Sequence, residues 1–175
     1  MSDYRGLPAG LSAPEDDGAA DHLPGTPLPP LLADLGASLL VAYIYPRTGV
    51  PGVPLPDGWD DIPGARGCTP QSCAYRDALA QFEQLGAVVV GISTQTPSEQ
   101  AEFADREHIP FPLLSDPELR LAQALGLPTF AVDGITLYRR LTLVAEAGKI
   151  VKAFYPVFPP DRDAAEVLGW LSERG

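Results

Sequence analysis

Apolar residues are grouped along the chain in runs that predict alternating strands and helices. Residues 38–45 (SLLVAYIY) form a continuous apolar run that ends at Pro46, and residues 87–93 (AVVVGIS) form a second such run. Short runs rich in β-branched and aromatic residues are typical of strands that are buried on both faces. A third, shorter strand is predicted over residues 111–114.

Helical periodicity and helix-end signals predict helices between and after these strands. Gly86 and Gly126 each follow a helical stretch and predict its end, because glycine readily adopts the conformation that terminates a helix. The predicted helices cover residues 69–85, 98–108, 117–125 and 161–174.

The last third of the chain has a different pattern. Two strands are predicted over residues 135–144 and 149–155, joined by a hairpin turn at residues 146–148 (EAG). The early alternation of strands and helices implies parallel strands with right-handed crossovers, whereas the late hairpin adds antiparallel strands. The sequence therefore predicts an α/β domain with a mixed central β-sheet and helices on both faces. This order of elements resembles the thioredoxin fold.

Two segments lack such patterning. Residues 1–30 are rich in proline, glycine and aspartate and are predicted to be an irregular N-terminal segment, followed by one domain over residues 31–175. Residues 47–66 contain four prolines and four glycines and are predicted to form a long loop inside that domain. Structureless loops of this length are often functional, so a lid over a pocket is one interpretation of this loop.

Composition and charge restrict the partners and the compartment. The net charge is −11, with 23 acidic and 12 basic residues, which argues against nucleic acid or an anionic membrane as a partner. No signal peptide is visible and the apolar runs are too short to span a bilayer, so we expect a cytoplasmic protein. In that compartment a transient catalytic disulfide is more common than a permanent structural one.

The chemistry centres on the only two cysteines, Cys68 and Cys73, which open the predicted helix 69–85. Backbone N–H groups at a helix start have no partner within the helix, and together with the helix dipole they favour a negatively charged sulfur. The second cysteine is placed to react with the first once the first is oxidised. The pair therefore predicts a peroxide-reducing site.

Helix geometry restricts how the two cysteines can join. The Cα atoms of residues i and i+5 in an α-helix are roughly 8.5 Å apart, whereas a disulfide needs less than about 7 Å. The first turns must unwind, or Cys68 must lie outside the regular helix. Pro70 disfavours helical geometry at Thr69, so the Thr69–Pro70 step is a predicted weak point.

Other interpretations of the pair are weaker. One alternative is that both cysteines are buried, unreactive thiols with no chemical role. A zinc site normally has four ligands, and the only histidines, His22 and His108, are distant in sequence. The tighter Cys-x-x-Cys spacing of dithiol reductases is absent.

Four motifs resemble the peroxiredoxins of the PrxQ, or bacterioferritin comigratory protein, group of AhpC/TSA-type redoxins. The similarity runs from about residue 38 to the C-terminus. The motifs are residues 43–46 (YIYP), 67–77 (GCTPQSCAYRD), 91–94 (GIST) and 111–116 (FPLLSD).

The resemblance implies a thiol-dependent peroxidase that reduces hydrogen peroxide and organic hydroperoxides. By analogy, Cys68 attacks the peroxide and becomes a sulfenic acid, and Cys73 resolves it to an intramolecular disulfide that thioredoxin or a similar dithiol reductant recycles. The family also uses an arginine that leads a later strand; Arg140 fits that pattern best, and the adjacent Arg139 fits an ungapped alignment. No cofactor or metal is expected, and the protein should be a monomer or weak dimer.

The chain departs from the family pattern ahead of Cys68. The family has a threonine or serine three residues before this cysteine and a proline seven before, where this chain has Ala65 and Asp61. Pro46 lies 22 residues before Cys68. The resemblance thus implies an insertion of about 15 residues within loop 47–66, longer than most connections between elements.

Other residues of this region could compensate. Thr48 is the first candidate for the missing hydroxyl, and Thr69 is another. Trp59 is too large to be left exposed without reason, and we expect it to pack near Cys68. The loss of the usual hydroxyl at Ala65 leaves two alternatives to a peroxidase, a thiol redox sensor and an inactive thioredoxin-like scaffold.

Overall fold

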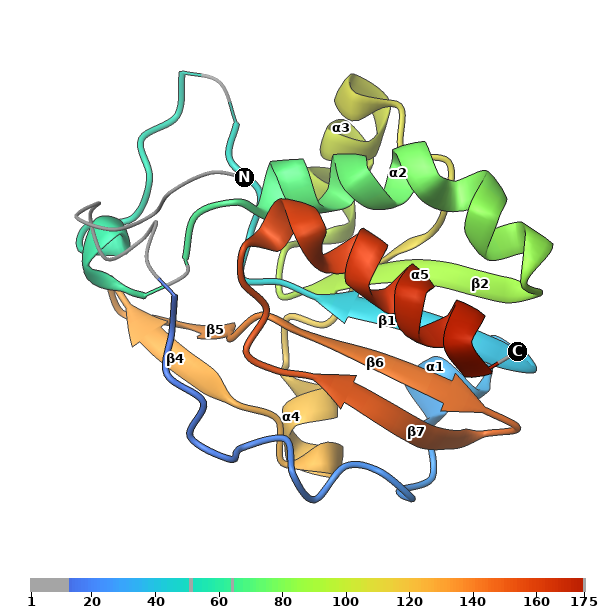
Figure 1. Ribbon diagram of the computed structural model, residues 1–175. Helices are drawn as coiled ribbons and strands as arrows, with labels where there is room; N and C mark the ends of the chain where they lie inside the picture. Colours follow the sequence, from blue (N-terminus) through green and yellow to red (C-terminus); the bar gives the residue numbers. More distant parts are fainter. Residues whose placement is uncertain (1–12, 51, 64, 175) are drawn as a thin grey trace.

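The central element of the fold is a mixed five-stranded sheet in the order β3–β2–β1–β6–β7 (Figure 1). The computed structural model of the protein describes residues 13–50, 52–63 and 65–174. Strands β1, β2 and β3 are parallel, and β6 and β7 are antiparallel to their neighbours. The strands are β1 (Leu39–Ile44), β2 (Ala87–Ser93), β3 (Leu113–Ser115), β6 (Leu141–Glu146) and β7 (Lys149–Phe154). The predicted α/β sheet is confirmed.

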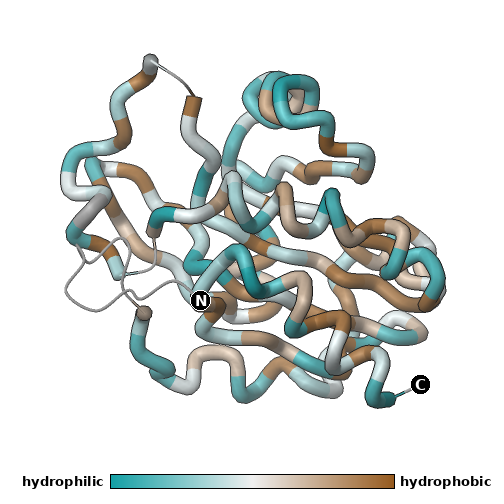
Figure 2. Tube along the Cα trace, turned by 45° about the horizontal axis from the view of Figure 1, so that its top comes forward, coloured by the Kyte–Doolittle hydropathy of each residue, from teal (hydrophilic) through white to brown (hydrophobic). Residues whose placement is uncertain are grey.

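Helices cover both faces of this sheet, because β1 is apolar on both sides. Val41 and Tyr43 belong to the core beneath α2 and α5, whereas Leu40, Ala42 and Ile44 belong to the core on the opposite face. Figure 1 shows α2 and α5 side by side on one face, and Figure 2 shows long hydrophobic stretches along the central strands. The helices are α1 (Pro30–Ala33), α2 (Cys68–Gln84), α3 (Pro97–Glu107), α4 (Arg120–Leu125) and α5 (Asp163–Arg174).

The prediction of one strand over residues 135–144 was wrong. The chain leaves one sheet and enters another between residues 138 and 141, so this range holds parts of two strands. β5 (Ile135–Tyr138) pairs with β4 (Thr129–Val132) in a separate two-stranded sheet, and β6 begins only at Leu141. Asp133 and Gly134 both have positive φ at the β4–β5 turn, a conformation that favours this residue pair in tight hairpins. Arg139 and Arg140 therefore form the link between the two sheets.

Short 3₁₀ turns described in the structure include η2 (Trp59–Asp61) in the long loop and η3 (Pro160–Arg162) before α5. Among the residues that the structure describes, no helix has both the length and the apolar character needed to cross a membrane.

The start of α2 is packed tightly against the C-terminal segment. Gly67, which precedes the helix, has a φ of 111°, and a Cβ atom there would lie 2.7 Å from Cγ of Pro160. Only glycine combines this backbone conformation with so close an approach. Cys68 therefore begins its helix at a fixed position against η3.

Candidate active site

Cys68 is buried, with 4% of its surface exposed, and is the first residue of α2. The Nη2 group of Arg140 donates a hydrogen bond to its Sγ at 3.3 Å, and the thiol faces the Ala65 carbonyl oxygen at 4.0 Å. The guanidinium and the free N–H groups of the first helical turn both favour a negative charge on this sulfur. Of the two predicted arginines, the structure brings Arg140 to the cysteine.

Several acceptors fix the Arg140 guanidinium in place. Nη2 also donates to the carbonyl oxygens of Ala65 at 3.2 Å and Arg66 at 3.3 Å, and Nη1 donates to Oε1 of Gln71 at 2.6 Å. Residues just before and just after Cys68 thus hold the same cation. Because Arg140 is only 5% exposed, little rearrangement is needed to keep its charge directed at the sulfur.

A buried carboxylate extends this network. Oδ2 of Asp163 accepts hydrogen bonds from Gln71 Nε2 at 3.1 Å and from the Tyr75 and Thr142 hydroxyls at 2.6 Å each. Burial raises the pKa of Asp163, and these three hydrogen bonds together with the Arg140 charge oppose that rise. Since the side-chain NH₂ group of Gln71 donates to the carboxylate, the side-chain oxygen of Gln71 is turned toward Arg140. Asp163 thereby sets the orientation of the Gln71 side chain, which binds Arg140.

Arg139 has different surroundings, although it is adjacent in sequence. Its guanidinium lies over the Phe130 ring, 5.6 Å from the ring centroid, and its backbone N–H donates to the Pro128 carbonyl. A small cavity of about 20 Å³, lined by both arginines and by Pro46 and Ala65 among others, lies beside this link.

Cys73 lies one and a half turns further along α2 and is partly buried. Its thiol faces Oε2 of Glu107 at 3.7 Å, at the end of α3. Both cysteines are free thiols within one continuous helix. Burial raises the pKa of Cys73, the nearby Arg76 lowers it and Glu107 raises it again.

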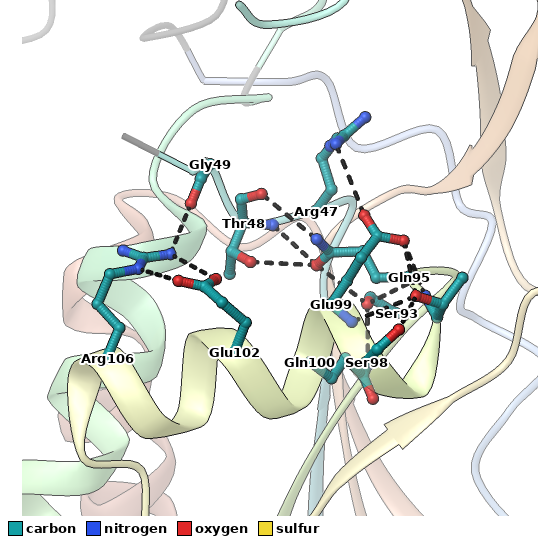
Figure 3. Close-up of polar contacts among 11 residues, drawn as sticks. Arg47, Thr48, Gly49, Ser93, Gln95, Ser98, Glu99, Gln100, Glu102 and Arg106 are labelled. Atoms are coloured by element: carbon teal, nitrogen blue, oxygen red, sulfur yellow. Dashed lines mark hydrogen bonds and ion pairs between the residues drawn. The ribbon is translucent and has the colours of Figure 1, made fainter. Parts of the chain in front are cut away.

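Thr48 is buried, but its hydroxyl donates a hydrogen bond to Gln95 and not to Cys68. Its Oγ1 and its backbone N–H both donate to Oε1 of Gln95, at 3.2 and 3.0 Å (Figure 3). Because a hydroxyl has a single proton, this arrangement leaves Thr48 no donor for the sulfur. Its observed contacts anchor the start of loop 47–66 beside α3, where Arg106 also binds the Gly49 carbonyl.

We therefore expect Thr48→Val to lower the free energy of unfolding by about 1 kcal/mol, the usual cost of one hydrogen bond. The rate of peroxide attack should stay within about 2-fold of the unmodified protein, well under 1 kcal/mol of activation free energy. Chemical denaturation and stopped-flow oxidation measure the two quantities. A loss of about 10-fold in rate at unchanged stability would instead support the predicted role beside Cys68.

Trp59 is 3% exposed and packs against the β4–β5 hairpin, with its ring centroid 6.2 Å from that of Phe130. Ala65 belongs to the same cluster, and its carbonyl oxygen accepts from Arg140. Trp59 is thus linked to the cysteine site through Ala65. Gln71 and Asp163 were not expected from the sequence; the only signal was a glutamine three residues after Cys68, on the same side of the helix.

Comparisons with known proteins identify the family to which this chain belongs. The profile of the Redoxin family matches residues 31–168. A Mycobacterium tuberculosis protein named as a peroxiredoxin is 36% identical over 132 residues, which are 72% of this chain and 73% of that protein. The Bcp peroxiredoxin of Bacillus subtilis is 27% identical over 149 residues, or 82% of this chain and 85% of its own.

Solved structures show the same fold. Peroxidoxin BcpB from Mycobacterium tuberculosis aligns with a TM-score of 0.62 and 28% identity, covering 77% of this chain and 79% of that one. A cysteine-to-serine variant of PrxQ from Xylella fastidiosa aligns with a TM-score of 0.69 and 24% identity, covering 87% of this chain and 98% of that one. With its thioredoxin-like fold and these relatives, the chain belongs to the Redoxin family and is a peroxiredoxin, a thiol-dependent peroxidase.

Proposed function

We propose that this peroxiredoxin uses an atypical two-cysteine mechanism, in which Cys68 is oxidised by the peroxide and Cys73 resolves the product. The observation that carries the proposal is the Arg140 guanidinium 3.3 Å from the Cys68 sulfur at the start of α2. The substrates are hydrogen peroxide and organic hydroperoxides.

In the first step the Cys68 thiolate attacks one peroxide oxygen. An S–O bond forms, the O–O bond breaks, and the leaving oxygen takes a proton and departs as water or an alcohol. Arg140 stays protonated and presents several donors, so it supports the thiolate before the attack and the negative leaving oxygen during it. Cys68 is left as a sulfenic acid, which condenses readily with a thiol.

In the second step the Cys73 sulfur attacks the sulfenic sulfur. An S–S bond forms, the S–O bond breaks, and the thiol proton leaves with the hydroxyl group as water. Because both residues lie in one continuous helix, the first turns of α2 must unwind before the two sulfurs meet. Pro70, in the first turn, disfavours helical geometry at Thr69, which makes this part of the helix easier to unwind. Thioredoxin or a similar dithiol then restores both thiols by disulfide exchange.

The disulfide is tested directly by treating the reduced protein with one equivalent of hydrogen peroxide. We expect the intact mass to fall by two hydrogen atoms, with no dimer on a non-reducing gel, and thioredoxin to reverse the change. Tandem mass spectrometry of the digested protein should join the peptides of Cys68 and Cys73. An exclusively intermolecular disulfide would contradict the mechanism.

A further inference from the structure

The two cysteines of α2 face opposite charges. The Cys68 sulfur accepts a hydrogen bond from the Arg140 guanidinium at 3.3 Å, whereas the Cys73 thiol faces the Glu107 carboxylate at 3.7 Å. A cation beside a sulfur favours the thiolate, and an anion beside it favours the protonated thiol. Glu107 has no part in the mechanism described above.

The other charged groups around Cys73 are largely engaged with one another. From α2, Arg76 donates through Nε to Asp77 at 2.9 Å and through Nη1 to the Glu107 backbone carbonyl at 2.5 Å. From α3, Arg106 donates to Oε1 of Glu107 at 3.3 Å, which leaves Oε2 facing Cys73.

Tyr43 of β1 is a further titratable neighbour of Cys73; burial raises its pKa well above the ordinary value, so this phenol stays neutral. Among the charged neighbours of Cys73, Arg76 lowers the pKa of the thiol, and Glu107 and Asp77 raise it. Substitution of Arg76 and substitution of Glu107 should therefore shift the pKa of Cys73 in opposite directions.

We propose that Glu107 is a specificity-determining residue that keeps Cys73 as the unreactive thiol in the reduced, folded protein, so that peroxide reacts at Cys68. When the start of α2 unwinds, Cys73 moves away from the carboxylate and becomes available to the oxidised sulfur. This inference rests on the proposed roles of the two cysteines. In this view the last residue of α3 influences which of the two sulfurs reacts with peroxide.

The test isolates Cys73 in a Cys68→Ser background and follows its alkylation by iodoacetamide from pH 6 to pH 10. Glu107→Gln removes the negative charge but keeps the side-chain shape, so the alkylation profile should shift to lower pH. At neutral pH the rate should rise by about 3-fold or more, because only the thiolate reacts. Arg76→Met should shift the profile in the opposite direction.

Glu102→Gln is the matched control, since Glu102 lies on the same helix and binds Arg106 but not Cys73. A Glu107→Gln profile that coincides with the Glu102→Gln profile would overturn the proposal. Circular dichroism and thermal melts of each variant check that α3 is intact. The Arg76→Met arm tests the same electrostatic balance by a substitution in α2, and its melt also reports the loss of the Arg76 contact with the Glu107 carbonyl.

A second readout follows the oxidant itself. In the same Cys68→Ser background, hydrogen peroxide is added with a 1,3-dione probe that traps sulfenic acid. Glu107→Gln should increase the labelling of Cys73 relative to Glu102→Gln, and equal labelling would contradict the proposed selectivity. The intramolecular disulfide of the otherwise unmodified protein does not depend on this result, so the two proposals fail separately.

Discussion

Cys68→Ser is expected to abolish peroxide turnover, whereas Cys73→Ser is expected to block only recycling. Serine cannot supply the nucleophilic thiolate, so the first variant should lose at least about 1000-fold in rate, or about 4 kcal/mol of transition-state stabilisation. The second variant keeps Cys68 with its Arg140 contact and should consume one equivalent of peroxide rapidly before stopping.

Rapid-mixing measurements with stoichiometric peroxide separate this single turnover from steady-state activity with thioredoxin. After the burst, mass spectrometry of Cys73→Ser should show Cys68 as sulfenic or more highly oxidised acid. If Cys73→Ser failed in the single turnover while Cys68→Ser still reacted, the roles of the two sulfurs would be reversed.

Arg140→Met is expected to slow the attack on peroxide by about 100-fold or more, which corresponds to about 2.7 kcal/mol. Methionine keeps an apolar stem of similar length but removes the donors to Cys68 and Gln71. Arg139→Met is the matched control, because Arg139 lies over Phe130 and should leave the rate nearly unchanged. Stopped-flow oxidation of both variants measures the difference.

Removing a buried guanidinium also leaves carbonyl groups without their donor, so stability must be measured alongside rate. Arg140→Lys separates the two effects, since lysine keeps the charge but loses the fork of donors that holds Gln71 and Ala65 together. A rate ordering of unmodified protein, Lys variant and Met variant would support the proposed role. Equal losses in the Arg139 and Arg140 variants would contradict it.

Local patterns predicted the elements that carry the two cysteines and the central strands. The apolar runs marked β1 and β2 within a residue of their observed bounds, and Gly86 marked the end of α2. The sheet and its mixed strand directions followed from the order of these elements. These features depend on residues close together in the sequence, so the sequence alone could predict them.

Several features that depend on distant contacts were not predicted, whereas the arginine beside Cys68 followed from the family resemblance. Residues 135–144 alternate like a single strand, and only pairing with β4 shows that the chain changes sheets at Arg139. Gln71 and Asp163 look like surface polar residues, but contacts among α2, β6 and α5 bury them together. The Thr48 hydroxyl likewise was assigned from spacing alone, which gave no sign of the Gln95 amide beside it.

The packing of Trp59 on the β4–β5 hairpin has an evolutionary consequence. The hairpin runs directly into Arg140, and the long loop contacts both: Trp59 packs on the hairpin, and the Ala65 carbonyl oxygen accepts a hydrogen bond from the arginine. A change in the loop can therefore reach the arginine through the Ala65 and Arg66 carbonyl groups, without altering the strands or helix that define the fold. Sequence changes that accumulate in this loop can therefore act on the site from outside, while the two sulfurs and their helix stay constant.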